Sequence, residues 1–366
     1  TLAVGSVVFV AVVGPWLWRV RKVPADQATA GQATMGWVSA ALAAVLVGLE
    51  VRSVAMLVTR ANEFQTAGGS TLILESAQQV DAGACHRLES LAGVDGAAAV
   101  TVNSHTAHPA NLPQQAVPVV RATPGLAGIL GVRPDGAGVW VSQEAADQLG
   151  LQVGSTIVLD GQSTRVAAVY AYPEDGRRPG LGYAVVEPVP ASGVFDECWV
   201  RSWPVSDAIV PALTATSFHP GQEQSQRRLS QLNGTKGATF DGASELARRP
   251  SALAGTAALV AGLLIGYAAW RLRRLELASA RHAGVPTRAL WLTAMVEVVA
   301  LLAIMWAWGA VVTLWATRGL SPGDAGQVLP FAGRVLLSIS VGLILGASVA
   351  VWTARERQLF DFFKGR

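Results

Sequence analysis

The sequence predicts a membrane protein in which an α-helical transmembrane bundle carries an inserted extracytoplasmic α+β domain. Several apolar runs have the length of about 20 residues that spans a bilayer as a helix. Charged residues make up only 14% of the chain, against roughly 25% in soluble domains. Basic residues cluster beside the apolar runs, as at the cytoplasmic ends of membrane helices. These observations predict four core helices and an additional N-terminal one.

Residues 1–34 are predicted to form an N-terminal hydrophobic segment and a connector. The apolar run at 2–20 ends in a basic cluster at 19–22, and a polar connector follows at 24–34. A secretory signal would place its positive charge before the apolar run, not after it. We therefore expect an extra helix with its N-terminus outside.

Residues 35–62 are predicted to form the first core helix and a stalk. The apolar run at 35–58 contains Glu50 and Arg52, two ionisable side chains that are costly in hydrocarbon. We favour an interpretation in which the span ends near Glu50 and the helix continues outside as a stalk. The alternative is an intramembrane polar pair that lines a substrate path.

Residues 63–250 form a polar segment that is long enough for a domain of its own. Asp160-Gly161 is a strong hairpin signal between two β-rich runs. The expected elements are strands at 70–75, 139–141, 156–159 and 164–170, a helix at 143–149 closed by Gly150, and helices at 222–232 and 242–248.

The two cysteines, Cys85 and Cys198, both fall in this middle segment. A disulfide is the expected state if the segment lies outside the cell, because oxidising compartments preserve such bonds. Two buried free thiols are the alternative.

Residues 251–366 are predicted to contain three spans, a cytoplasmic loop at 271–288 and a basic tail. Basic residues flank the membrane at 19–22, 271–288 and 355–366, and all three lie on one side if the spans alternate. This pattern places the 63–250 domain outside the cytoplasm. The spans are expected at 251–270, 289–317 and 330–353, with a turn at 321–324.

Glu297 lies inside the predicted span at 289–317 and is a functional candidate for that reason. One interpretation is a coupling role. The other is a carboxyl group that faces neighbouring helices or pairs at the cytoplasmic interface.

The sequence contains no enzyme signature that we recognise. A Walker A loop needs a Gly directly before its Lys, and none of the three lysines follows a glycine. There is no GxSxG motif, and the spacing of His105 and His108 is not completed by a Cys or carboxylate pattern. We therefore expect no catalytic site, no metal and no cofactor in this chain. The net charge of +3 gives no case for nucleic acid.

The run from Arg273 to Glu297, RRLELASARHAGVPTRALWLTAMVE, resembles the signature of FtsX-like and MacB-like ABC transporter permeases, the type VII class. The segments at 139–169 and 67–75 resemble the outer domain of that family. With the order of the spans, the resemblance covers about residues 35–355. The signature positions are filled here by Arg273, Arg274, Glu276, Arg281, Gly284, Arg288 and Glu297.

The resemblance implies a multi-pass protein of the bacterial inner membrane that pairs with a second permease subunit, as a homo- or heterodimer, among membrane lipids. A separate ABC ATPase would bind ATP and Mg²⁺ and dock on the loop at 271–288. The pair would export or extract a peptide, a lipid or a hydrophobic compound. The alternative is a non-transporting subunit that regulates a cell-wall hydrolase or a sensor kinase through ATP-driven motion.

Two features depart from the family pattern. The last span ends in WTARERQ, where a Pro-Ala-Arg-Arg type run is usual, and the 1–20 segment exceeds the four-helix plan. A third possibility is a membrane receptor without an ATPase, but a receptor needs no basic loop of this kind.

Overall fold

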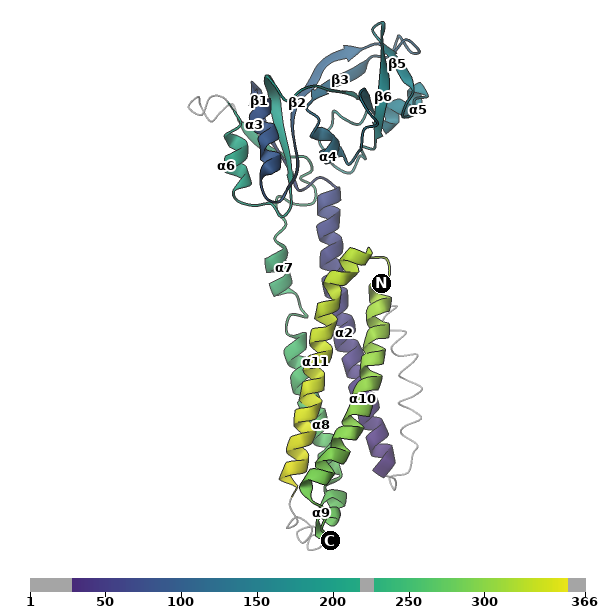
Figure 1. Ribbon diagram of the computed structural model, residues 1–366, viewed down its shortest axis with the longest axis vertical. Coiled ribbons are helices and arrows are strands. Elements are labelled where there is room, and N and C mark those ends of the chain that lie inside the picture. Colours follow the sequence, from purple (N-terminus) through teal and green to yellow (C-terminus); the bar gives the residue numbers. More distant parts are fainter. Residues whose placement is uncertain (1–27, 218–226, 355–366) are drawn as a thin grey trace. The chain divides into compact units, whose positions relative to one another are not determined.

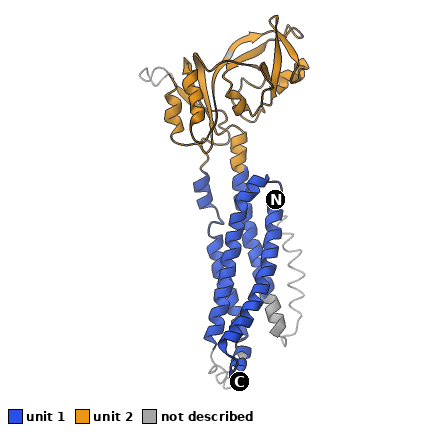
Figure 2. Ribbon diagram, viewed as in Figure 1, with its two compact units in different colours: residues 1–59, 242–366 blue, residues 60–241 orange. Residues whose placement is uncertain are grey.

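The computed structural model describes residues 28–217 and 227–354. The chain forms two compact units, one from residues 1–59 and 242–366 and the other from residues 60–241 (Figure 2). The second unit therefore ends at residue 241, not at the predicted 250. The predicted N-terminal helix at 2–20 and the basic tail at 355–366 lie outside the described residues.

The first unit is helical. Within the described residues, four helices are long and apolar enough to cross a membrane (Figure 1). They are α2 (Ala28–Thr66), α8 (Ala254–Leu272), α10 (Thr287–Ala316) and α11 (Pro322–Thr353), and the shorter helices are α7 (Gly242–Arg248) and α9 (Arg274–His282).

Two of these helices are longer than their apolar runs predict. Helix α2 begins at Ala28, inside the segment predicted to be a connector. Helix α11 begins at Pro322, because the Ser321 side chain accepts a hydrogen bond from the Asp324 backbone N–H and caps the helix. Pro330 was expected to start the span but lies inside α11. Hydropathy identifies only the apolar part of a membrane helix. It does not detect polar residues that extend the helix beyond the hydrocarbon region.

Helices α8 and α11 pack closely through small residues. A Cβ atom at Gly262 or Gly266 of α8 would collide with backbone atoms of α11, and one at Gly342 or Gly346 would collide with α8. Such small-xxx-small spacing lets two membrane helices approach closely. The close approach of α8 and α11 therefore requires glycine at these four positions.

The second unit is built on a mixed sheet. Its described residues contain nine strands in the order β5-β6-β4-β7-β3-β2-β8-β1-β9. The β3–β7 and β4–β6 pairs are parallel and the other pairs are antiparallel. The strands are β1 (Thr71–Asp81), β2 (Val94–Ala107), β3 (Val117–Ala122), β4 (Val139–Ser142), β5 (Thr156–Leu159), β6 (Gln162–Tyr170), β7 (Val185–Pro188), β8 (Val194–Ser202) and β9 (Arg228–Gln231).

Helices pack beside this sheet (Figure 1). They are α3 (Ala82–Arg87), α4 (Leu126–Leu130), α5 (Gln143–Leu149) and α6 (Ile209–Thr214), with a 3₁₀ turn at Leu88–Ser90. The fully buried side chains of Ile73, Tyr170 and Trp199 belong to the largest core cluster of this unit. The expected α+β architecture is therefore present.

The local predictions with the clearest chemical signals are confirmed. Strands β5 and β6 pair around Asp160 and Gly161, which both have positive φ (46° and 83°), as a tight hairpin turn requires. Helix α5 ends at Gly150 in the left-handed conformation.

The predicted helix at 222–232 is wrong where the structure describes it. Residues Arg228–Gln231 form strand β9, which pairs antiparallel with β1 at the end of the sheet. The open edge of β1 offers backbone hydrogen bonds to a segment whose local pattern alone does not indicate a strand.

Candidate functional site

The loop predicted to face an ATPase is a short helix between two turns. Helix α8 ends at Leu272 and α9 follows from Arg274 to His282. Gly284 then adopts a φ of +85°, and Pro286 is the N-cap of α10. The Gly and Pro therefore break the helix, because glycine tolerates the left-handed conformation and proline cannot continue a preceding helix.

Arg273 connects this loop to two membrane helices. Its Nε lies 2.8 Å from Glu276 Oε2 and its Nη1 lies 3.0 Å from Glu297 Oε2. Its guanidinium carbon also lies 4.8 Å from the centre of the Trp270 ring. The Arg273 cation is therefore engaged inside the chain rather than directed at a partner.

The ion pair with Arg273 also explains how Glu297 is accommodated in α10. The structure gives its carboxylate a cationic partner close to the α9 end of the helix, which is the pairing arrangement anticipated as one of two alternatives. A coupling role for Glu297 stays a prediction.

Helix α9 is also fixed to the end of α11. Arg281 Nη1 donates a hydrogen bond to the carbonyl oxygen of Ala354, the C-cap residue of α11. On the inner face of α9, Leu277 and Ala278 are buried, and Leu277 joins a core cluster with Trp270, Ala294 and Ala347. Since these residues come from α8, α10 and α11, α9 is held by three membrane helices.

The outer face of α9 remains accessible. Glu276, Ser279 and His282 are exposed, and so is the turn at residues 283–286. Gly284 lies in open space at this turn. The side chain of Arg274 lies outside the described residues, and Arg288 is exposed in the first turn of α10. Of the residues predicted for ATPase coupling, Arg273 and Arg281 thus hold the loop in place, while Glu276 and Gly284 lie on its accessible surface.

A second polar site lies at Glu50 of α2, which is completely buried. Glu50 Oε1 lies 2.6 Å from Arg249 Nη2 and 2.8 Å from Arg334 Nη2. Phe331 lies beneath both guanidinium groups, at 5.1 and 5.9 Å from its ring centre. Three segments therefore meet at one carboxylate. They are helix α2, helix α11 and the residues that precede helix α8.

Arg52 does not share this site. Its side chain is exposed, and Glu50 takes its partners from other helices. The alternative interpretation, an intramembrane pair of Glu50 and Arg52, is therefore not what the structure shows. Instead, α2 runs on without a break to Thr66, as the stalk interpretation expects.

Sequence analysis missed Arg249 and Arg334. Arg334 lies inside the span predicted at 330–353, so the rule that flagged Glu297 could have found it. Arg249 precedes the apolar run of α8 and carries no such signal. Its pairing with Glu50 joins residues that are 199 positions apart.

The second unit contains the predicted disulfide between Cys85 of α3 and Cys198 of β8, with a Cα–Cα distance of 5.9 Å. Both residues are fully buried in a core cluster that also contains Leu74 and Val200. The bond fastens α3 onto the sheet and closes a loop with a sequence separation of 113 residues.

Comparison with solved structures gives distant likenesses, which include two domains of bacterial proteins. The periplasmic region of MacB from Actinobacillus actinomycetemcomitans aligns with a TM-score of 0.36 and 10% identity, covering 47% of this chain and 94% of its own. A domain of a protein described as a permease from Porphyromonas gingivalis aligns with a TM-score of 0.32 and 14% identity, covering 48% and 94%. No family model and no curated protein matches the chain. Neither likeness is high enough to assign a family.

Proposed function

We propose that this chain is the membrane subunit of an ABC-type transporter and works with an ATPase made as a separate polypeptide. ATP and Mg²⁺ would bind to that partner. Two membrane subunits, identical or different, would pair, and their movement would export or extract a peptide, a lipid or a hydrophobic compound. The signature at residues 273–297 supports this proposal together with the four membrane-capable helices and the domain inserted between the first two of them.

The observation that carries the proposal is how α9 is attached. Its inner face is held to α8, α10 and α11 by Leu277, Arg273 and Arg281, while its outer face and the turn at 283–286 stay accessible. A load applied to the accessible face would therefore pass directly to three membrane helices. A short, rigidly anchored helix is what an ATPase needs in order to move the bundle.

We further propose that α9 faces the cytoplasm of a bacterial cell, across the inner membrane, and that residues 60–241 lie on the other side. The basic residues around α9 favour the cytoplasm for that end. The Cys85–Cys198 disulfide favours an oxidising compartment for the second unit.

A second candidate function keeps the ATPase but omits transport. Helix α2 continues without interruption from the apolar run to Thr66, at the start of the sheet domain. Such a helix could transmit motion to a regulated cell-wall hydrolase or sensor kinase instead of moving a substrate. Recovery of such an enzyme with the complex would favour this candidate.

The docking role of α9 can be tested with one exposed apolar residue. Val285 is 37% exposed in the turn after α9, and Val153, 52% exposed in the second unit, is the matched control. An aspartate at a well-packed interface position commonly costs more than 1 kcal/mol, so we expect Val285→Asp to weaken ATPase binding about tenfold. Val153→Asp should leave it within about twofold.

The measurement is ATPase binding and ATP turnover in the purified complex. Because both substitutions add one negative charge to an exposed site, a loss common to both indicates a general effect of charge. Unchanged binding and turnover in Val285→Asp would show that the ATPase does not dock at this turn.

A further inference from the structure

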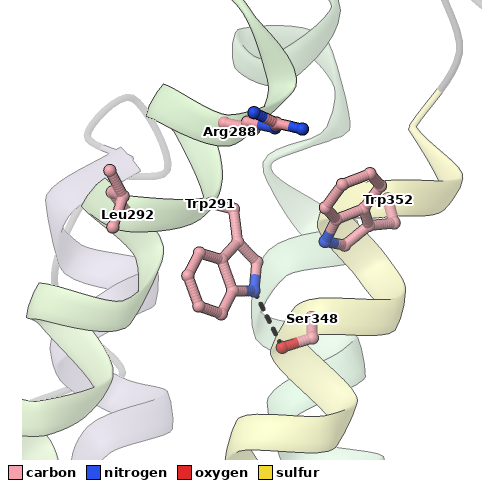
Figure 3. A pocket seen from close by; sticks show the side chains of 5 residues that line it. All are labelled: Arg288, Trp291, Leu292, Ser348 and Trp352. Atoms are coloured by element: carbon pink, nitrogen blue, oxygen red, sulfur yellow. Dashed lines mark hydrogen bonds between the residues drawn. The ribbon is translucent and has the colours of Figure 1, made fainter.

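A hollow of about 540 Å³ lies between the first turns of α10 and the last turns of α11. Figure 3 shows Trp291 and Trp352 on facing helices around it, with the Arg288 side chain extending from the start of α10. The volume falls in the range typical of small-molecule sites. The lining residues are Arg288, Trp291, Leu292, Ser348 and Trp352.

The walls of this hollow are largely apolar. Trp291 Nε1 donates a hydrogen bond of 3.0 Å to Ser348 Oγ (Figure 3). That bond satisfies the indole N–H and leaves the ring surfaces available for contact. Leu292 and Trp352 are both 59% exposed, so they present apolar surface to whatever surrounds the helices. The chemistry of the walls suits a hydrocarbon chain.

The rim of the hollow is cationic. Arg288 is exposed, and no carboxylate within residues 28–217 and 227–354 forms an ion pair with it or with Arg281. Arg281 Nη1 donates its hydrogen bond to the carbonyl oxygen of Ala354, two residues after Trp352. Among the described residues, Glu276 and Glu297 are engaged by Arg273. Within the described part of the chain, the charge of Arg288 is therefore available to an external anion.

We propose that this hollow binds an anionic phospholipid from the membrane leaflet on the side of α9. The phosphate would pair with Arg288, and one acyl chain would lie against Trp291, Leu292 and Trp352. The site lies where α10 begins and α11 ends, which is the depth at which headgroups meet membrane helices and at which Trp and Arg are enriched. Basic pockets between membrane helices are suited to acidic headgroups.

This site does not depend on an ATPase, and it gives Arg288 a role other than docking. The test uses the full chain alone in nanodiscs that contain either phosphatidylglycerol or phosphatidylcholine with a photoactivatable acyl chain. Cross-linked peptides are mapped by mass spectrometry. We expect phosphatidylglycerol to label the peptides around residues 291–292 and 348–352 about fivefold more than phosphatidylcholine, since one arginine near the surface contributes roughly that factor.

Arg318 provides a matched control because it is an exposed arginine at the opposite end of α10. Arg288→Gln should remove the preference for phosphatidylglycerol, and Arg318→Gln should keep it. Equal labelling by the two lipids in the unmodified chain would indicate only general bilayer contact and would overturn the proposal. So would an absence of label in the hollow, or a headgroup preference that survives Arg288→Gln.

Discussion

Glu50 is the residue on which the arrangement of the helical unit most depends. It is fully buried and receives two arginines from other parts of the chain, Arg249 and Arg334. Removing one partner of a buried ion pair leaves an uncompensated charge, which is costlier than the pair was favourable. The site therefore specifies one arrangement of α2, α8 and α11 and penalises others.

We predict that Glu50→Gln destabilises the protein by about 3–5 kcal/mol, because two guanidinium groups would then face each other without a carboxylate. Arg334→Gln should cost only about 0–1 kcal/mol, since the Arg334 side chain is 47% exposed and water screens its charge. Denaturant titration of the detergent-solubilised chain measures the change in free energy of unfolding for both variants.

Arg52→Gln is the control for that measurement. Arg52 lies two positions along the same helix, is exposed, and forms no ion pair within the described part of the chain. We expect its loss to change stability by less than about 0.5 kcal/mol, as at most surface positions. If Glu50→Gln and Arg52→Gln unfold at the same denaturant concentration, the Glu50 site does not hold the helices together.

The sequence identified Glu50 as a candidate residue but did not identify its ion-pair partners. The cost of charge in hydrocarbon identified Glu50 and Arg52 together, and it could not tell which was buried. The partners Arg249 and Arg334 are separated from Glu50 by 199 and 284 positions, and their approach depends on how whole helices pack. Cys85 and Cys198 were easier, because two cysteines allow only one intramolecular pairing.

Among the elements, the α8–α11 pair has the most exacting geometry. Gly342 faces the backbone of α8 around Leu259, with no room for a side chain. In a membrane, where the hydrophobic effect does not drive helices together, such close contact supplies the packing energy. The two helices should therefore move together when α9 is displaced.

We predict that Gly342→Ala destabilises the protein by about 1–3 kcal/mol, because the added methyl group must push α8 and α11 apart. Gly333→Ala on the same helix meets open space and should be neutral or stabilising by up to about 1 kcal/mol, because alanine favours helix. Thermal unfolding in one detergent compares the two variants. Equal behaviour of Gly342→Ala and Gly333→Ala would contradict the close packing.

Helices and strands were predicted correctly where nearby turn or cap residues determine their ends. The hairpin around Asp160-Gly161 and the end of α5 at Gly150 follow from turn and cap chemistry alone. Strand β9 was mistaken for a helix because its pairing with β1 comes from a distant part of the chain. The predicted start of helix α11 lies too far along the sequence, because Ser321-Pro322 was interpreted as a turn. In the structure, Ser321 caps the helix and Pro322 is its first residue.

At the scale of the whole molecule, one helical unit is interrupted in sequence by a sheet domain, and the two segments that flank this domain belong to the same unit. Hydropathy and charge predicted this organisation, since apolar runs and basic clusters are properties of long segments. They could not predict that Arg273 and Arg281 would hold α9 in place, because both interactions depend on the ends of other helices.

The measurement that tests the central claim most directly is purification of the full chain from its native cells in mild detergent, followed by quantitative mass spectrometry. The account predicts an ABC ATPase in near-equal amount to the membrane subunits, released when the turn after α9 carries Val285→Asp and retained with Val153→Asp. Recovery of the chain without any ATPase in several mild detergents would contradict the account and would leave a membrane receptor as the better explanation.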